Sequence, residues 1–193
     1  MSRMRSLGTV LLIVALAAAA TACSKDDDTA TSSDRGVITF EDPPEGSTDL
    51  GLCYAYDIAQ MKELVGGDET FKRLAPEAIG VEGDPVTGEA CSWERKEANG
   101  DTRTLRIEVR NYGADTAGLA EQFATLEEGT LEAQTVEGLG DAAYSSVSEE
   151  TSLLQVRSEG YMLTLASRAT GSLDPIDLDS LELLAAAGLE QLP

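Results

Sequence analysis

Apolar and charged residues alternate regularly in the centre of the chain, within the segment Thr102–Tyr112. A period of two is typical of a β-strand with one buried and one solvated face. The preceding segment Ala90–Arg95 is predicted to be its partner strand, because Asn99-Gly100 between them favours a tight hairpin turn. The alternating residues are Leu105, Ile107 and Val109 on the apolar side and Arg106, Glu108 and Arg110 on the polar side.

Three segments carry apolar residues at the helical spacing of three and four. We expect one helix over Tyr56–Val65, ended by Gly66-Gly67, and another over Asp115–Leu126. A third helix is expected from Asp174-Pro175 to about Gly188, because aspartate is a favourable N-cap and proline fits the first helical position. The inward-facing residues are Ile58, Met61, Leu64 and Val65, then Leu119, Phe123 and Leu126, then Leu178, Leu181 and Leu184 or Ala185.

The remaining segments complete a mixed fold. Short strands are predicted over Ala142–Val147, Ser152–Arg157 and Tyr161–Ser167, with Glu159-Gly160 as a tight hairpin. Residues 68–90 are rich in Gly, Pro and Glu, and we expect a loop there with room for one helical turn. The element order is then α-β-β-α-β-β-β-α. This order indicates an α+β fold, an antiparallel sheet of about five strands covered by helices.

The first residues have the pattern of an export signal. Arg3 and Arg5 precede an apolar run from Leu7 to about Ala20. A membrane-spanning helix needs about twenty apolar residues, so this run is too short to cross a bilayer comfortably. A basic head, an apolar stretch and small residues before a cleavage site are typical of a signal peptide.

The chain divides into three parts on these grounds: a signal peptide at 1–22, a flexible acidic tether at 23–36 and a single extracytoplasmic domain at 37–193. The segment Ser24–Gly36 contains no apolar residue larger than alanine, so it has nothing to bury. At the start of the domain, Val37–Phe40 is typical of either a docking segment or an edge strand, and Pro43-Pro44 ends it.

The signal closes on Ala20-Thr21-Ala22-Cys23, which resembles the lipobox of bacterial lipoproteins. The resemblance implies that the Cys23 thiol is diacylated, with palmitate-like chains, and that cleavage occurs before it. Two chains give stable anchoring, because each buried methylene contributes about 0.8 kcal/mol. The chain is then expected on the extracytoplasmic face of a cell membrane. An ordinary secretory signal, cut after Ala22 to leave a free thiol, fits the same residues.

Composition excludes one class of partner. The formal charge is −21 for the whole chain and −23 after the signal is removed, because residues 1–22 contain Arg3 and Arg5 and no acid. Phosphate backbones repel an anion of this density, so we expect no nucleic acid partner. The acidity itself is typical of a soluble surface or of a habitat adaptation, and it identifies no site.

Two cysteines remain once Cys23 is assigned to the anchor. Cys53 and Cys91 belong to an exported chain, where disulfides persist, and we expect them to form a bridge. The alternative is two free thiols. A loop of nearly forty residues closed in this way lowers the entropy of the unfolded chain, which stabilises the fold by about 3–4 kcal/mol.

Several motifs together resemble a family of uncharacterised actinobacterial lipoproteins: Cys53 before a helix, Cys91-Ser-Trp93, Gly138-Leu-Gly-Asp141 and a Leu/Ala-rich closing helix. The resemblance covers about residues 50–190. It implies an anchor, a disulfide and a fold, and it brings no catalytic residues because the family has no established reaction. The element order is also similar to that of a PsbP-like sandwich, which is an analogy of fold alone.

Catalytic chemistry is restricted by what the chain lacks. It contains no histidine, which excludes Ser-His-Asp and Cys-His machinery and imidazole metal ligands. We find no phosphate-binding glycine loop, and we expect no cofactor and no metal site. Carboxylates are abundant, so the number of acidic residues does not exclude a glycosidase that uses two carboxyl groups.

Aromatic residues offer the main candidate for a ligand site. Most of them fall near the ends of predicted elements, where rings with polar tips suit a groove for a lipid, glycan or peptide. The alternative is that they complete the core. We expect a binding or accessory lipoprotein of the cell envelope that contacts an envelope protein or carries a small amphiphile and catalyses no reaction. The competing hypothesis is a carboxylate-dependent hydrolase acting on cell-wall glycans. The candidate groove residues are Tyr56, Trp93, Tyr112, Tyr144 and Tyr161.

Overall fold

The computed structural model describes residues 51–67 and 69–193. The signal peptide, Cys23, the tether and the segment Val37–Phe40 lie outside the described residues, so the division of the chain at residues 22 and 36 stays a prediction.

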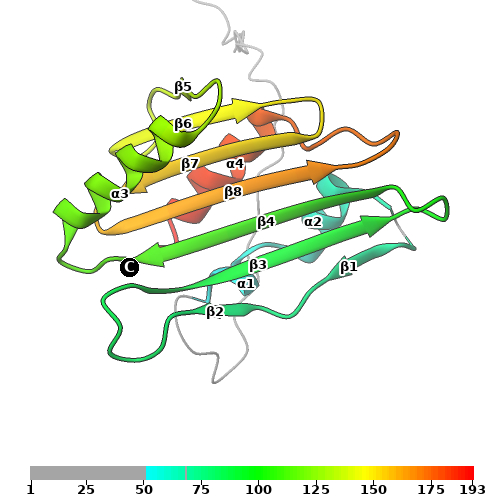
Figure 1. Cartoon of the computed structure of the whole chain (residues 1–193). Coiled ribbons are helices and arrows are strands. Elements are labelled where there is room, and N and C mark those ends of the chain that lie inside the picture. The colour runs from blue at the N-terminus through cyan, green and yellow to red at the C-terminus, as the bar shows by residue number, and fades with distance from the viewer. Residues whose placement is uncertain (1–50, 68) are drawn as a thin grey trace, which may run out of the picture. The chain divides into compact units, whose positions relative to one another are not determined.

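The described chain is organised around a single antiparallel sheet (Figure 1). Its order is β1-β3-β4-β8-β7-β6-β5, and β2 also pairs with β3. The long strands lie in the middle and the short ones at the edges. The strands are β1 (Phe71–Arg73), β2 (Glu77–Ile79), β3 (Thr87–Lys96), β4 (Thr102–Asn111), β5 (Gln134–Thr135), β6 (Ala142–Val147), β7 (Thr151–Ser158) and β8 (Tyr161–Ala169).

Four helices cover parts of both faces. Figure 1 shows α1, α2 and α4 behind the sheet and α3 in front of it. Behind the sheet, α1 and α2 contact β3, and α4 contacts β7 and β8, whereas α3 contacts β7 and β8 from the front. The helices are α1 (Leu52–Ala55), α2 (Ile58–Val65), α3 (Thr116–Gly129) and α4 (Leu178–Leu189).

The predicted fold was wrong in its strand number and element order. The sheet has eight strands instead of about five, and the described elements do not follow the order α-β-β-α-β-β-β-α. The additional strands are β1 and β2, in the segment predicted as a loop, and β5. Each is only two or three residues long and pairs along part of β3 or β6. Segments this short show no periodicity of their own, so the sequence alone gave no signal for them.

The main core lies between the sheet and the three helices behind it. Leu105, Ile107 and Val109 of β4 all point to that side and are 0% exposed, as the alternation predicted. Ile107 lies between Cys91 of β3 and Leu165 of β8 in the register of the sheet. From the helices, the residues that complete this core are Leu52, Cys53, Met61, Val65, Leu181, Leu184 and Ala185.

The opposite face of β4 is polar. Arg106 pairs with Glu77 of β2, with 2.9 Å between Nη1 and Oε2, and Arg110 pairs with Glu108, with 2.5 Å between Nε and Oε1. No helix covers this part of the front face in Figure 1. The strand therefore has one buried and one solvated side, as its period of two predicted.

The predicted disulfide is confirmed. Cys53 and Cys91 are bridged, with their Cα atoms 5.2 Å apart, and both are buried. The bridge joins α1 to β3. Arg73 of β1 holds the same helix from another side, because its Nη2 donates to the carbonyl of Cys53 and its guanidinium lies over the ring of Tyr54. A helix of four residues is not stable alone, so these contacts fix its position.

Two helix starts differ from the prediction. The helix expected over Tyr56–Val65 begins at Ile58, because the Asp57 side chain caps it by accepting from the amides of Ala59 and Gln60. The last helix begins at Leu178 with Asp177 as its cap, instead of at Asp174-Pro175. The residues directly before it are not helical, and the buried amide of Ile176 donates to the Ser167 hydroxyl of β8.

No helix within residues 51–67 and 69–193 has the length and apolar character needed to cross a bilayer.

Tyr56, which lies just before α2, packs against α4 at Gly188. The Tyr56 hydroxyl donates to the carbonyl of Leu184 at 3.3 Å, and the ring packs edge-on against Trp93 with 5.9 Å between centroids. Burial raises the pKa of the Tyr56 hydroxyl far above its ordinary value. A Cβ atom at position 188 would lie 2.4 Å from this hydroxyl oxygen. Only glycine leaves room for it.

The first prediction concerns this contact. Gly188→Ala is expected to lower the free energy of unfolding by about 1–3 kcal/mol, because the added methyl overpacks the core. Gly129→Ala is the control, since a Cβ at position 129 meets nothing within 4 Å. Chemical denaturation measures both, and the double variant with Tyr56→Phe should recover part of the loss. An equal change in the free energy of unfolding for the two variants would show that Gly188 is not needed to make room for Tyr56.

Candidate functional site

A second, smaller core lies on the front face under α3. Asp115 caps this helix by accepting from the Gly118 amide at 2.9 Å. Only Leu119 and Phe123 of the helix are fully buried, and the Phe123 ring packs against Tyr144 with 5.2 Å between centroids. The helix is therefore held through a narrow apolar stripe. The buried members of this core are Tyr112, Leu119, Phe123, Tyr144 and Met162.

Polar side chains are buried beneath the same helix. The Tyr144 hydroxyl donates to Gln155 Oε1 and accepts from the Thr130 hydroxyl at 3.4 Å, while Gln155 Nε2 lies 3.1 Å from the Met162 sulfur. Tyr144 and Gln155 are both buried. Desolvation raises the pKa of the Tyr144 hydroxyl, the hydrogen bond from Thr130 lowers it, and the nearby Glu127 carboxylate raises it further. The C-terminal end of α3 is thereby connected to the sheet.

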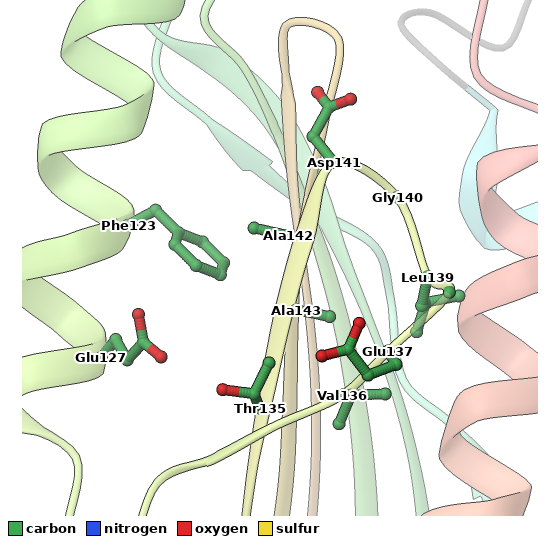
Figure 2. Close-up of a pocket in the computed structure, with 11 residues that line it drawn as sticks. Phe123, Glu127, Thr135, Val136, Glu137, Leu139, Gly140, Asp141, Ala142 and Ala143 are labelled. Atoms are coloured by element: carbon green, nitrogen blue, oxygen red, sulfur yellow. The ribbon is translucent and has the colours of Figure 1, made fainter.

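A crevice opens between α3 and the segment that runs from β5 to β6 (Figure 2). Its volume is about 290 Å³. Figure 2 shows Phe123 and Glu127 extending from α3 toward β6, and Glu137 extending from the facing loop. We call this the α3 crevice. Its lining residues are Phe123, Glu127, Thr135, Val136, Glu137, Gly138, Leu139, Gly140, Asp141, Ala142 and Ala143.

The Gly-Leu-Gly-Asp motif forms one wall of the α3 crevice. Gly138 and Gly140 both have positive φ angles, 78° and 60°, which favour glycine. A Cβ at Gly140 would lie 2.5 Å from the carbonyl oxygen of Arg157, so the loop passes directly against β7. Asp141 fixes it there, because its amide donates to the same carbonyl and its carboxylate accepts from the Glu159 amide. The motif thus holds the wall in place.

Arg157 lies beside the crevice and forms no ion pair with the residues that the structure describes. It is the cross-strand partner of Ala142, and its guanidinium carbon lies 5.9 Å from the centroid of the Phe123 ring. Its Nε is buried and has no hydrogen-bond partner among the described residues. The guanidinium therefore contributes a positive charge close to a crevice whose own charged lining residues are all acidic.

A second hollow of about 430 Å³ lies at the other end of β7 and β8. Its wall combines acids with small residues and contains no aromatic ring. The α3 crevice is the better candidate for a binding site, because ligand sites usually combine apolar and aromatic surface with a few polar groups. The lining residues of the second hollow are Glu149, Glu150, Ala169, Thr170, Gly171, Leu173 and Asp174.

The five aromatic residues expected to line a groove do not share one. Tyr56 and Trp93 are buried in the main core, and Tyr161 packs half-buried against it. Tyr112 and Tyr144 are buried in the core under α3. The sheet separates the two groups, because alternate positions of a strand point to opposite faces. The five rings therefore pack into the cores on the two faces of the sheet, which is the alternative that the sequence offered for them.

One group of residues has metal-ligand geometry within the part of the chain that the structure describes. The sulfurs of Cys53 and Cys91 and a carboxylate oxygen of Glu89 lie within 4.8 Å of one another. The two sulfurs are bonded to each other, so neither is available as a thiolate ligand. Glu89 is buried and accepts from the Cys53 amide at 3.2 Å, which helps to seat α1 on β3.

Sequence reasoning missed the two carboxylates that face the crevice. Glu127 lies on α3 and Glu137 on the loop after β5, and neither forms a hydrogen bond or ion pair through its side chain with the described residues. The chain has 35 acidic residues, so being a glutamate did not distinguish either residue as part of a site. The nearest hint was the Gly-Leu-Gly-Asp motif, which begins directly after Glu137.

Comparisons of the chain with protein-family models, with curated proteins and with solved structures found no match.

The second prediction concerns the polar contacts under α3. Tyr144→Phe removes the hydroxyl that bonds Gln155 and Thr130 and leaves a buried amide oxygen unpaired, so we expect a loss of about 1–3 kcal/mol in the free energy of unfolding. Tyr161→Phe is the control, because the Tyr161 hydroxyl makes no hydrogen bond with the described residues. Urea denaturation of both variants measures the difference. Equal stability of the two variants would show that the network contributes nothing.

Proposed function

We propose that this chain is a lipid-anchored accessory lipoprotein of the bacterial cell envelope, which binds a partner through the α3 crevice and catalyses no reaction. The partner is an envelope protein or a small amphiphile, and it is not a nucleic acid. The observation that carries the proposal is the crevice of about 290 Å³, which has both an aromatic wall and carboxylates.

The location of the protein is inferred from its first residues. The basic head, the short apolar run and Ala20-Thr21-Ala22-Cys23 support export followed by lipidation at Cys23. The order of motifs supports membership of the actinobacterial lipoprotein family that they resemble. The charge of −23 that remains once the signal is removed supports a domain that stands away from anionic headgroups on its tether.

The composition of the crevice supports binding. Phe123 and Ala142 supply apolar surface on the α3 side, and the polar side chains of the lining are Glu127, Thr135, Glu137 and Asp141. This combination is typical of sites that hold a small ligand or a single side chain of a partner. A volume of about 290 Å³ is at the lower end of the range for such sites, so the ligand group is small.

The chain's residues favour binding over catalysis. It contains no histidine to act as a base, and the one hydroxyl-bearing side chain on the crevice wall is Thr135. A carboxylate-dependent hydrolase of cell-wall glycans is the second candidate, because Glu127 and Glu137 line the same crevice. Such an enzyme needs two carboxyl groups that flank the scissile bond, one of them protonated.

The third prediction concerns the anchor. Cys23→Ser is expected to release the protein from the membrane fraction into the soluble fraction, because a serine cannot receive the thioether-linked acyl chains. Cell fractionation and the mass of the N-terminal peptide measure the change. Ser24→Ala is the control and should stay in the membrane fraction. A Cys23→Ser protein that remains in the membrane fraction would contradict lipidation.

The fourth prediction concerns binding. We expect native mass spectrometry of the mature protein, purified under non-reducing conditions from its own envelope, to show a bound species that is lost on denaturation. Ala142→Leu should abolish this species, because its side chain fills the crevice. Ala124→Leu on the exposed side of α3 should retain it. A bound species present equally in both variants, or in neither variant nor the wild type, would contradict the proposal.

The hydrolase is distinguished by incubating the wild type with purified cell-wall glycan. Release of soluble fragments that is lost in both Glu127→Gln and Glu137→Gln would favour the enzyme. We expect no release from the wild type.

A further inference from the structure

We propose that α3 is a lid, which opens as a unit while the rest of the fold stays intact and uncovers the face of the sheet beneath it. The inference rests on the proposed function only for the ligand that would enter, the small amphiphile. The movement itself follows from how few side chains hold α3 in place, from the polar groups that it buries, and from the residues at its two ends.

Two buried side chains hold α3 on the sheet. Of its 14 residues only Leu119 and Phe123 are fully buried, whereas α4, with 12 residues, buries four. A helix of this length is marginal in water without tertiary packing, so its position depends on these contacts. Segments with few buried apolar contacts open locally at a lower free energy than the core of the domain. Of the two long helices, α3 is therefore expected to open first.

The closed position of α3 leaves two hydrogen-bond donors poorly satisfied. Arg157 Nε is one of two buried side-chain atoms in residues 51–67 and 69–193 that have no hydrogen-bond partner, and its guanidinium lies beside the Phe123 ring. Gln155 Nε2 has the Met162 sulfur as its acceptor, at 3.1 Å, and a thioether is a weak acceptor. Burying a donor without a good acceptor costs free energy, which is regained when water reaches it. These groups therefore favour opening.

Both ends of α3 leave room for a change in backbone direction. Gly113, shortly before the helix, has a φ of 56°, and a Cβ atom there would meet nothing within 4 Å. A Cβ atom at Gly129, the last residue of the helix, would also meet nothing within 4 Å. Hinges commonly consist of a few such residues at the ends of elements, which absorb the change in φ and ψ.

Opening of α3 would change the chemistry of the α3 crevice. The side chains beneath the helix are Tyr112, Tyr144 and Met162, and all three are buried while it is in place. Phe123 lines the crevice and packs on Tyr144, so the crevice borders this covered surface. A lid that moves away joins the two and adds aromatic surface to a mostly polar opening. Such a surface suits the apolar part of an amphiphile.

Hydrogen exchange tests whether α3 opens by itself. The full mature protein is held in phosphatidylcholine nanodiscs, and deuterium uptake of α3 and α4 is followed by mass spectrometry at several urea concentrations below the unfolding transition. We expect α3 amides to exchange at least about tenfold faster than α4 amides, after correction for intrinsic rates, and with a weaker dependence on urea. Equal exchange with equal urea dependence would show that α3 opens only in global unfolding, which would overturn the inference.

Arg157→Met tests the role of the buried donor. The variant keeps a long apolar chain beside Phe123 but removes the unpartnered N–H, so we expect α3 to exchange about fivefold more slowly. Arg168→Met is the control, because Arg168 is exposed near the other end of β8 and its loss should leave α3 exchange unchanged. Unchanged or faster exchange of α3 in Arg157→Met would overturn the role assigned to this donor.

Methionine oxidation tests whether the movement uncovers the sheet. Two methionines follow residue 22: Met162 beneath α3 and Met61 in the main core, which are 3% and 0% exposed. Hydrogen peroxide transfers one oxygen atom to an accessible thioether sulfur and leaves water. We expect Met162 to be oxidised at least about tenfold faster than Met61, because local opening of α3 reaches only Met162. Equal rates for the two would overturn the lid.

The outcomes separate this inference from the proposed function. If α3 opens by itself but native mass spectrometry shows no bound species, the lid is supported and the proposed function is overturned. If a species is bound but α3 and α4 exchange together, the lid is overturned and the crevice remains a binding site.

Discussion

The fold depends on β4 having one apolar, buried face and one polar, solvated face. This strand pairs along its length with β3 on one side and β8 on the other, so its register decides which residues of all three strands face the helices. Leu105, Ile107 and Val109 occupy the buried face, and a slip of one residue would exchange them for arginines and glutamate. The same constraint places α3 and its crevice. Because one face is filled by α1, α2 and α4, α3 packs on the other, over β7 and β8.

Strands and turns were predictable where their own residues show the alternation or the turn residues that are typical of them. The strand β6 was predicted at its observed bounds, Ala142–Val147, and the turn at Glu159-Gly160 lies between β7 and β8. The disulfide followed from the number of cysteines. The three shortest strands were missed, because each forms only by pairing with a longer neighbour. The start of α4 was misplaced for a related reason: Asp174-Pro175 is a good local start, but Ile176 is buried against the sheet and bonded to Ser167, so the helix begins only at Leu178.

The site was less predictable than the fold. Alternation along one strand shows which residues share a face, but it does not show which faces of two strands coincide. Trp93 on β3 and Tyr144 on β6 were therefore grouped together although the sheet lies between them. Glu127 and Glu137 are brought to one crevice by the packing of α3, and this packing depends on Phe123, Tyr144 and Arg157 from three different elements. The Gly-Leu-Gly-Asp motif is easily seen in the sequence. Its role as a wall of the crevice becomes evident only from the close approach of Gly140 to β7.

The short edge strands have a consequence for how these molecules behave when they are crowded together. On one side of the sheet β3 is bordered by two separate three-residue strands, and on the other β6 is bordered by a two-residue strand. Within residues 51–67 and 69–193, neither edge strand is long enough to offer an extended row of free amides and carbonyls to a neighbouring molecule, and Lys72 and Glu77 place charges on the first edge. Short, charged edge strands of this kind disfavour the growth of a continuous sheet from one molecule to the next.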